Sequence, residues 1–153
     1  MDTVSIEAAG LADLPLLLRH RRGMFRDMGY TEEDVLDRMQ AASRDFLTEA
    51  MRDGSYHAWV VKVDDRAVAS GGVHFVQWIP GCGDPGPRRA WVHGVYTEPD
   101  FRRRGLARRL MERIVAWCRQ SGCRDVLLHA TEQGRPLYES LGFRSSNEMR
   151  LEL

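Results

Sequence analysis

The stretch from Trp91 to Gln120 constrains the fold of this chain more than any other. It begins with β-branched and aromatic residues that favour a strand, is interrupted at Glu98-Pro99-Asp100, and continues with three arginines, Arg102 to Arg104. An amphipathic helix is predicted to follow, because apolar residues then recur at intervals of three and four while charged residues take the other face. The apolar face comprises Leu106, Ala107, Leu110, Met111, Ile114, Val115 and Cys118. The pattern therefore predicts a strand, a basic turn and a helix in direct succession.

The junction between this turn and the helix has the composition of an anion-binding site. The first turn of a helix leaves backbone N–H groups without internal partners and carries the positive end of the helix dipole. Gly105 would let the main chain approach a phosphate, Ala107 keeps a further position small, and the arginines can bind phosphate oxygens in a bidentate manner. We therefore expect a diphosphate to bind here, although neither GxxxxGK[ST] nor GxGxxG occurs in the chain.

Two segments of the chain resemble motifs of one enzyme superfamily. Arg102-x-x-Gly105-x-Ala107, placed directly after a strand end, resembles the acyl-CoA signature of the GNAT superfamily of N-acyltransferases. The segment from Gly134 to Phe143 is similar to the later motif of that family, in which a short helix carries a tyrosine and ends at Leu-Gly-Phe. With their surroundings the two motifs cover roughly Trp91 to Phe143. The resemblance implies an N-acetyltransferase that uses acetyl-CoA as acyl-donor cosubstrate and no metal.

Length and charge fit a single globular domain. The 153 residues suffice for one core and are few for two, so we expect one N-acetyltransferase domain over residues 1–153. The 22 basic and 22 acidic side chains cancel, so no global field favours nucleic acid or a membrane. No run approaches the ~18 apolar residues of a membrane span and no targeting segment is recognisable, so a cytoplasmic location is expected. The three cysteines have neither CxxC nor Cys/His spacing, which argues against disulfides and a metal site.

The resemblance implies an α/β, GNAT-like single domain with a mixed central sheet of about 6–7 strands flanked by about 4 helices. Periodicity and turn residues place two helices before Asp53, with further strands on either side of them. The expected strands are Thr3 to Ala8, Tyr56 to Val63, Ala67 to Gln77, the one ending near Thr97, Asp125 to Ala130, and a closing strand or hairpin within Phe143 to Leu153. Gly71-Gly72 indicates a bulge or a close backbone approach, and the Gly/Pro-rich residues Pro80 to Pro87 predict a projecting hairpin connection.

The resemblance also assigns the cofactor-binding residues. In the family, backbone groups at the strand end pair with the pantetheine arm, and N–H groups of the turn hold the diphosphate. In this chain the first role falls to Val95, Tyr96 and Thr97. The second falls to Arg102, Arg103, Arg104, Gly105, Leu106, Ala107 and Arg108.

Tyr138 is the candidate for the catalytic acid. A thiol ionises near 8.5 and a phenol near 10, so a tyrosine beside the departing sulfur can supply a proton without being ionised itself. The alternative interpretation is that Tyr138 is a core tyrosine on a short helix without a catalytic role. For the base we rank His93 first, because it lies two residues from Val95, on the same face by strand alternation, and an imidazole titrates near neutrality. Glu98, the histidines of neighbouring strands and a chain of waters are alternatives.

The acceptor is expected to be a primary amine of a small molecule or of a protein. No Ser or Cys has a base at motif spacing, so direct attack in a ternary complex is favoured over a covalent route. The variable front half would supply the acceptor site through Met24, Asp27 and Met28, with Trp78 at the mouth of the Gly/Pro-rich loop. Asp27, or Glu32 and Glu33, could attract a cationic amine, although ordinary helix packing also explains these residues.

Two other functions stay open. A catalytically silent acyl-CoA-binding sensor would share the fold, and Tyr138 argues mildly against it. An Arg-rich nucleic-acid-binding module could use Arg102 to Arg109, but the chain has no interleaved aromatic residues and no helix-turn-helix pattern. Members of the family often pair through C-terminal strands, so a homodimer is one state that the sequence leaves undecided.

Overall fold

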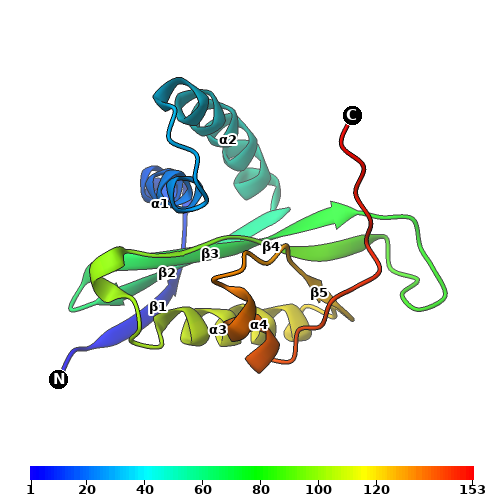
Figure 1. Cartoon of the computed structure of the whole chain (residues 1–153). Helices are drawn as coiled ribbons and strands as arrows, with labels where there is room; N and C mark the ends of the chain where they lie inside the picture. Colours follow the sequence, from blue (N-terminus) through cyan, green and yellow to red (C-terminus); the bar gives the residue numbers. More distant parts are fainter.

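A five-stranded β-sheet with helices on both faces organises the chain, which a computed structural model describes over residues 1–153. In chain order the elements are β1 (Val4–Ala8), the 3₁₀ turn η1 (Leu11–Asp13), α1 (Leu14–Asp27), α2 (Glu33–Asp53), β2 (Tyr56–Val63), β3 (Arg66–Gln77), β4 (Arg88–Thr97), the 3₁₀ turn η2 (Pro99–Phe101), α3 (Leu106–Gln120), β5 (Val126–Leu127) and α4 (Arg135–Ser140). Helices α1 and α2 lie on one side of the sheet, and α3 and α4 lie on the other (Figure 1). The expected α/β class is therefore confirmed.

The strands follow one another across the sheet in sequence order. The first three pairings are antiparallel, and the last, between β4 and β5, is parallel because α3 makes the crossover. This last ladder is short, since Ala90 pairs with Val126 and Trp91 with Leu127 and no further pair follows. From Val92 to Thr97, β4 consequently has no strand neighbour on its β5 side.

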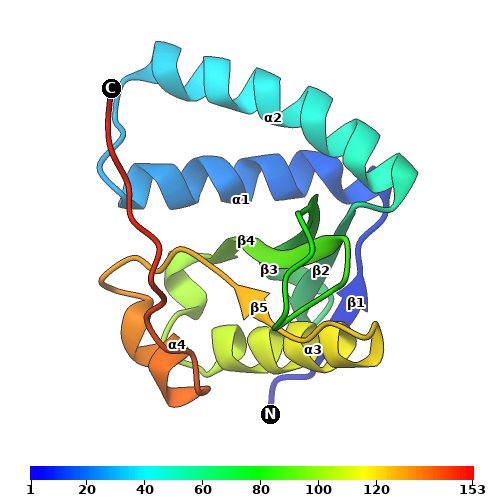
Figure 2. The same ribbon diagram turned by 90° about the vertical axis from the view of Figure 1, so that its right-hand side faces the viewer.

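The expectation of 6–7 strands is wrong, because the sheet has five. Residues 143–153, for which a strand or hairpin was expected, form no regular element; after α4 the chain runs past the sheet toward the level of α1 and α2 (Figures 1 and 2). Met149, Leu151 and Leu153 are 94%, 83% and 116% exposed. Their alternation is typical of a strand, but a strand also needs a neighbouring edge, and the two-residue β5 offers almost none.

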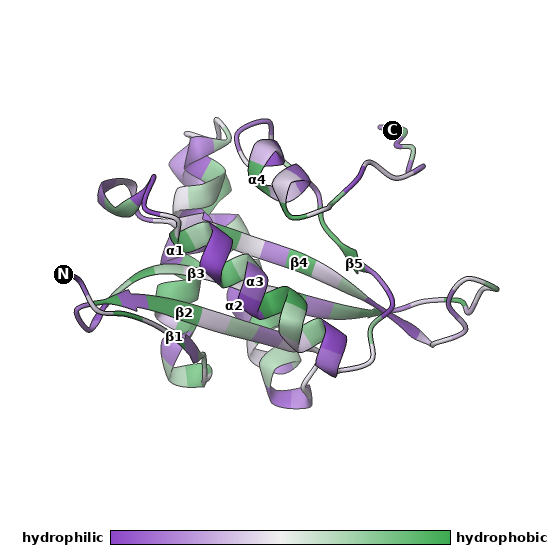
Figure 3. Ribbon diagram, turned by 90° about the horizontal axis from the view of Figure 1, so that it is seen from below, coloured by the Kyte–Doolittle hydropathy of each residue, from purple (hydrophilic) through white to green (hydrophobic).

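Apolar side chains form a core on each face of the sheet. On one face, the predicted stripe of α3 is buried: Leu110, Met111, Ile114 and Cys118 are fully inaccessible to solvent. Burial of each large apolar side chain stabilises the fold by about 1.5–3 kcal/mol. Figure 3 shows α3 lying across the strands, with hydrophilic and hydrophobic residues alternating along its length. A second cluster, formed by α1, α2 and β2, covers the opposite face. No helix combines the length and the apolar composition that crossing a bilayer requires.

A β-bulge interrupts the pairing of β3 with β4, as Gly71-Gly72 indicated. Ser70 pairs with Tyr96 and Gly72 with His93, so Gly94 and Val95 together lie opposite Gly71. Gly94 has φ +67°, which glycine adopts without strain. A side chain at Gly71 would lie 3.1 Å from Val95 Cγ2, so the close backbone approach is also present.

The bulge corrects one expectation about the site. Val95 packs against the core under α3, whereas the His93 ring lies 6.4 Å from that of His74, whose ring in turn contacts Phe46 of α2. The prediction that His93 and Val95 share a face is therefore wrong, because the extra residue resets the alternation between them.

Candidate active site

The turn between β4 and α3 presents a run of free backbone amides. Gly105, at the N-cap of α3, has φ +75°, and Arg103 has φ +64°. Left-handed residues in such turns direct successive N–H groups into one anion-binding concavity. The six amides of residues 103–108 donate to no oxygen of the chain, and the next one, Arg109 N–H, donates to the Gly105 carbonyl at 3.1 Å. These donors stand at the positive end of the α3 dipole, an arrangement that binds phosphate.

The surroundings of Gly105 are open. A Cβ atom placed on this residue would meet no atom within 4 Å. Glycine is therefore required by its left-handed backbone, which costs other residues about 1–2 kcal/mol, and not by crowding from the protein.

Arg102 is engaged inside the protein. Its Nε donates to the Thr97 carbonyl at 2.8 Å, its Nη2 lies 2.7 Å from Asp27 Oδ2, and its guanidinium stands 5.4 Å from the centre of the Tyr96 ring. The side chain thus joins the end of β4 to the last residue of α1. Asp27, expected to attract an amine, is held by this contact.

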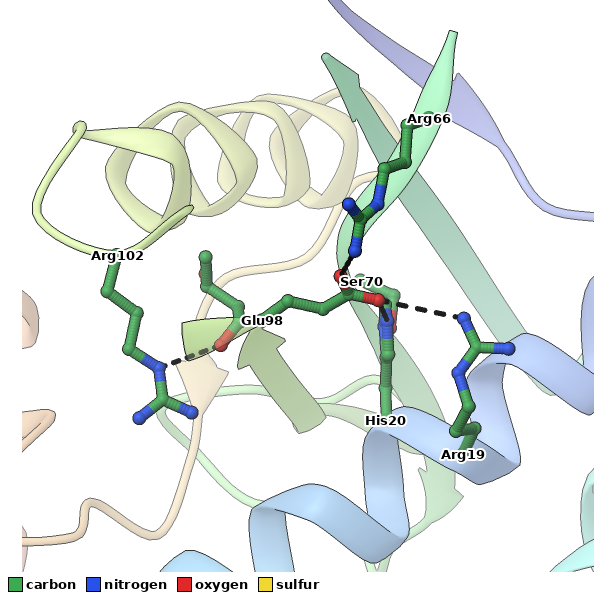
Figure 4. Close-up of polar contacts among 7 residues, drawn as sticks. Arg19, His20, Arg66, Ser70, Glu98 and Arg102 are labelled. Carbon is green, nitrogen blue, oxygen red and sulfur yellow. Dashed lines mark hydrogen bonds and ion pairs between the residues drawn. The ribbon is translucent and has the colours of Figure 1, made fainter. Parts of the chain in front are cut away.

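A buried polar network fixes the end of β4 (Figure 4). His20 is 1% exposed; its Nδ1 lies 2.8 Å from Ser70 Oγ and its Nε2 lies 3.4 Å from Glu98 Oε1. Arg66 donates to the other Glu98 oxygen at 2.8 Å, and Arg19 lies 3.6 Å from Oε1. Burial opposes ionisation of Glu98, but hydrogen bonds from His20 and Arg66 bring its pKa below the ordinary value. A carboxylate so engaged is a poor general base, and its position one residue after β4 suits it to hold the turn.

Little in the sequence indicates this network. His20 follows Leu17 by three residues, which predicts a position on the buried face of α1. Ser70 carries no comparable signal. Burial lowers the pKa of His20, so its imidazole is neutral at pH 7 and its two nitrogens can donate to one partner while accepting from the other.

Tyr138 lies on α4, next to the start of α3. A hydrogen bond from Arg108 in the first turn of α3 to the Ser140 hydroxyl ties the two helices together. The Tyr138 ring is half-buried and packs edge-on against Phe143 with ring centres 5.9 Å apart. Burial raises the pKa of the Tyr138 phenol, so the hydroxyl stays protonated at neutral pH.

His93 lies on the α1 and α2 side of β4. Burial is the main reason that its pKa falls to about 4, and the positive charge of Arg21 and the neighbouring His74 and His129 lower it further. The expectation that this imidazole titrates near neutrality is therefore wrong. With a pKa of about 4, the ring is neutral throughout the physiological range. The ring of His129 itself packs at a tilt against that of Trp91, with the ring centres 4.9 Å apart.

The remaining acceptor candidates do not form one group. Met24 and Met28 lie at the end of α1 that Arg102 binds through Asp27, and Met28 is 48% exposed. Trp78 is 49% exposed and lies far from this end of α1, in the connection between β3 and β4. Its backbone N–H donates to the Pro87 carbonyl at 2.8 Å.

Comparison with solved structures supports a single fold over the whole chain. A GCN5-related N-acetyltransferase from Ralstonia eutropha JMP134 superposes with a TM-score of 0.91 at 33% identity, over 99% of each chain. A predicted acetyltransferase with acetyl-CoA from Clostridium acetobutylicum superposes with a TM-score of 0.86 at 22% identity, over 99% of this chain and 96% of that one. At the latter identity the likeness concerns the fold alone.

Sequence comparison points to the same family. The glucosamine 6-phosphate N-acetyltransferase of Trypanosoma brucei brucei is 36% identical over 63 residues, which are 40% of this chain and 43% of that protein. The chain thus spans less than half the length of this relative. The model of the acetyltransferase (GNAT) family matches residues 20–143, from α1 to the residue that packs on Tyr138. Since that match covers most of the chain and the Ralstonia structure superposes from end to end, the chain belongs to the GNAT family of N-acetyltransferases.

Proposed function

We propose that residues 1–153 form a single catalytic domain that moves an acetyl group from acetyl-CoA to a primary amine by direct attack in a ternary complex. The observation that carries this proposal is the run of six unpartnered amides at residues 103–108, next to the unpaired edge of β4. An anionic group with several oxygen atoms can accept hydrogen bonds from such a run of amides, and the diphosphate of acetyl-CoA is a group of this kind.

The residues present fit that ligand. The amides of Arg103 to Arg108 would hold the diphosphate, since nothing in the chain covers Gly105. The edge of β4 would support the pantetheine arm through Val95 and Tyr96, because the Thr97 carbonyl is already bound by Arg102. Arg102 then acts by holding the strand end in place. Arg103 remains to add positive charge, whereas Arg104 lies 3.4 Å from Asp2 Oδ2 and donates to the Asp100 carbonyl at 3.1 Å.

Three side chains divide the catalytic work. Acetyl-CoA supplies the activated thioester, and Tyr138, kept protonated by burial, donates a proton to the departing sulfur. His93, neutral at pH 7, accepts a hydrogen bond from the attacking amine and passes its proton on to solvent, since a pKa of about 4 does not let it retain one. Glu98 positions the β4 end through its contacts with His20 and Arg66.

The amine acceptor agrees with the relative from Trypanosoma brucei brucei, whose name specifies an amino sugar phosphate. Neither the sugar nor the phosphate follows for this chain from that name. The common element is an amine nucleophile, from which the neutral His93 ring can accept a hydrogen bond.

Thermal melting tests the binding part of the proposal. Acetyl-CoA or CoA at about 100 times its dissociation constant should stabilise the protein by about 2.7 kcal/mol, a rise of about 5–10 °C in melting temperature, while duplex DNA should have no effect. Release of free CoA thiol across a panel of amines tests the chemistry. Stabilisation by DNA alone would overturn the proposal, and binding without turnover of any amine would indicate a sensor.

A further inference from the structure

Helix α1 carries four arginines, of which three are paired with carboxylates. Arg19, Arg22 and Arg26 have a side-chain nitrogen 3.6, 2.5 and 2.8 Å from a carboxylate oxygen. Arg21 has no ion pair in the structure. This difference is not explained by exposure to water, because Arg21 is half-buried while Arg19 and Arg26 have 64% and 51% of their side chains exposed.

Arg21 is held in place by neutral groups. Its Nε donates to Ser43 Oγ of α2 at 3.2 Å, and its guanidinium carbon stands 5.1 Å from the centre of the Phe25 ring. The terminal nitrogens Nη1 and Nη2 donate to no protein atom, and neither is sealed from solvent. A guanidinium in low-dielectric surroundings without an anion is unfavourable, and burial accordingly lowers the pKa of Arg21.

The charge of Arg21 acts toward the candidate active site. It adds to the lowering of the His93 pKa on β4, and it opposes the rise to about 12 that burial causes in the pKa of the Tyr56 phenol. His74, the other neighbour of His93, and His129 add no negative charge there. The acids in this region have partners of their own, since Asp53 Oδ1 accepts a hydrogen bond from the Ser55 N–H at 2.8 Å and Glu148 lies 3.2 Å from His129.

These observations define the charge of the surroundings of His93: they are positive, with one guanidinium whose two terminal nitrogens are free. Such surroundings disfavour an ammonium group, so an amine there is held in its neutral, nucleophilic form. They favour an anionic group elsewhere on the same molecule, because a carboxylate or phosphate can accept two hydrogen bonds from one guanidinium. Asp27 does not offset this charge, because Arg102 binds it.

We propose that the acceptor is a primary amine that also carries an oxyanion, carboxylate or phosphate, bound by the terminal nitrogens of Arg21. This inference rests on the proposed acetyl transfer and adds the class of its substrate. Arg21 is then a substrate-binding residue whose partner comes with the acceptor.

Matched amines test the inference with the wild-type protein. Each ω-amino acid of a series of chain lengths is compared with its amide, and 2-aminoethyl phosphate is compared with ethanolamine, so that the two arms separate carboxylate from phosphate. Charge-assisted hydrogen bonds of this kind should give the best anionic member about a 10- to 100-fold higher kcat/KM than its uncharged counterpart.

The variant Arg21→Gln should abolish that preference by raising KM for the anionic member far more than for the uncharged one, and Arg21→Lys should restore part of it. Arg38→Gln is the matched control, since Arg38 lies on α2 with 75% of its side chain exposed and pairs with Asp34 at 3.3 Å. It should leave the preference intact. Equal or better turnover of the uncharged members, or an equal loss on both members in Arg21→Gln, would overturn the inference.

Two further measurements distinguish a failure of this inference from a failure of the proposed function and from misfolding of the variant. The shift in melting temperature with acetyl-CoA reports on the donor site alone, so its absence in the wild type would refute the proposed function and not the acceptor class. If Arg21→Gln does not fold, inhibition of the wild type by amine-free carboxylates and by inorganic phosphate tests whether the acceptor site binds an oxyanion. Inhibition should be competitive with the amine and not with acetyl-CoA, and a complete lack of inhibition would overturn the inference.

Discussion

Replacing Gly105 with alanine separates backbone strain from loss of the anion site. Gly105 has φ +75°, and a Cβ there meets no protein atom within 4 Å. The substitution should therefore destabilise the fold only through the left-handed backbone, by about 1–2 kcal/mol. For a chain of this size that corresponds to a fall of about 2–8 °C in melting temperature.

The same methyl group should also weaken acetyl-CoA binding, an effect that the backbone strain does not explain because the strain is present in both the free and the bound protein. It would project beside the amides of residues 103–108 and keep a diphosphate from reaching them. The loss of one charge-assisted hydrogen bond is worth about 1.5–3 kcal/mol, which is about a 10- to 150-fold increase in the dissociation constant. Isothermal titration calorimetry with CoA and acetyl-CoA on the folded variant measures it directly.

Helix α3 supplies its own control at its other end. Gly122 has φ +81°, and a Cβ there also meets no atom within 4 Å. Gly122→Ala should lower the melting temperature about as much as Gly105→Ala and leave the affinity for CoA unchanged. If both variants bind CoA as the wild type does, or if both lose affinity equally, the amides before α3 do not hold the diphosphate and the reasoning fails.

Three further substitutions test the remaining roles. Tyr138→Phe should lower kcat by about 100-fold with no change in the dissociation constant of acetyl-CoA; a rate that is unaffected at every pH would remove Tyr138 as the acid. Glu98→Gln should cost about 1–3 kcal/mol in urea unfolding, whereas the exposed pair of Glu139 with Arg135, at 3.7 Å, predicts less than about 0.5 for Glu139→Gln; equal effects would contradict an anchoring role. Because the pKa of His93 lies below its ordinary 6.5, at about 4, the unfolded chain binds more protons between these values and stability falls as the pH is lowered through them. His93→Asn should flatten this part of the stability curve, and an unchanged slope would show that His93 does not cause it.

The sequence predicted the local features of the site better than its long-range contacts. The stripe of α3 and the left-handed Gly105 depend on residues that are close in the chain, so periodicity and one glycine suffice to locate them. The buried network joins His20 to Ser70 and Glu98, 50 and 78 residues away, and no local pattern reports such a pairing. The last expected strand failed for a related reason, since an alternating segment near Met149 forms a strand only where a partner edge exists.

The bulge at Gly94 would let β4 serve both proposed substrates. In regular β4, His93 and Val95 would point to the same face, and the donor and acceptor would compete for it. With two residues opposite Gly71, Val95 turns to the α3 side, where the amides of the α3 turn lie, while His93 stays on the side of α1 with Arg21. The proposed diphosphate site and the proposed acceptor site would therefore lie on different faces of the sheet. They would meet where β4 has no strand neighbour beyond Trp91, and a thioester along that edge would be open to an amine from the other face.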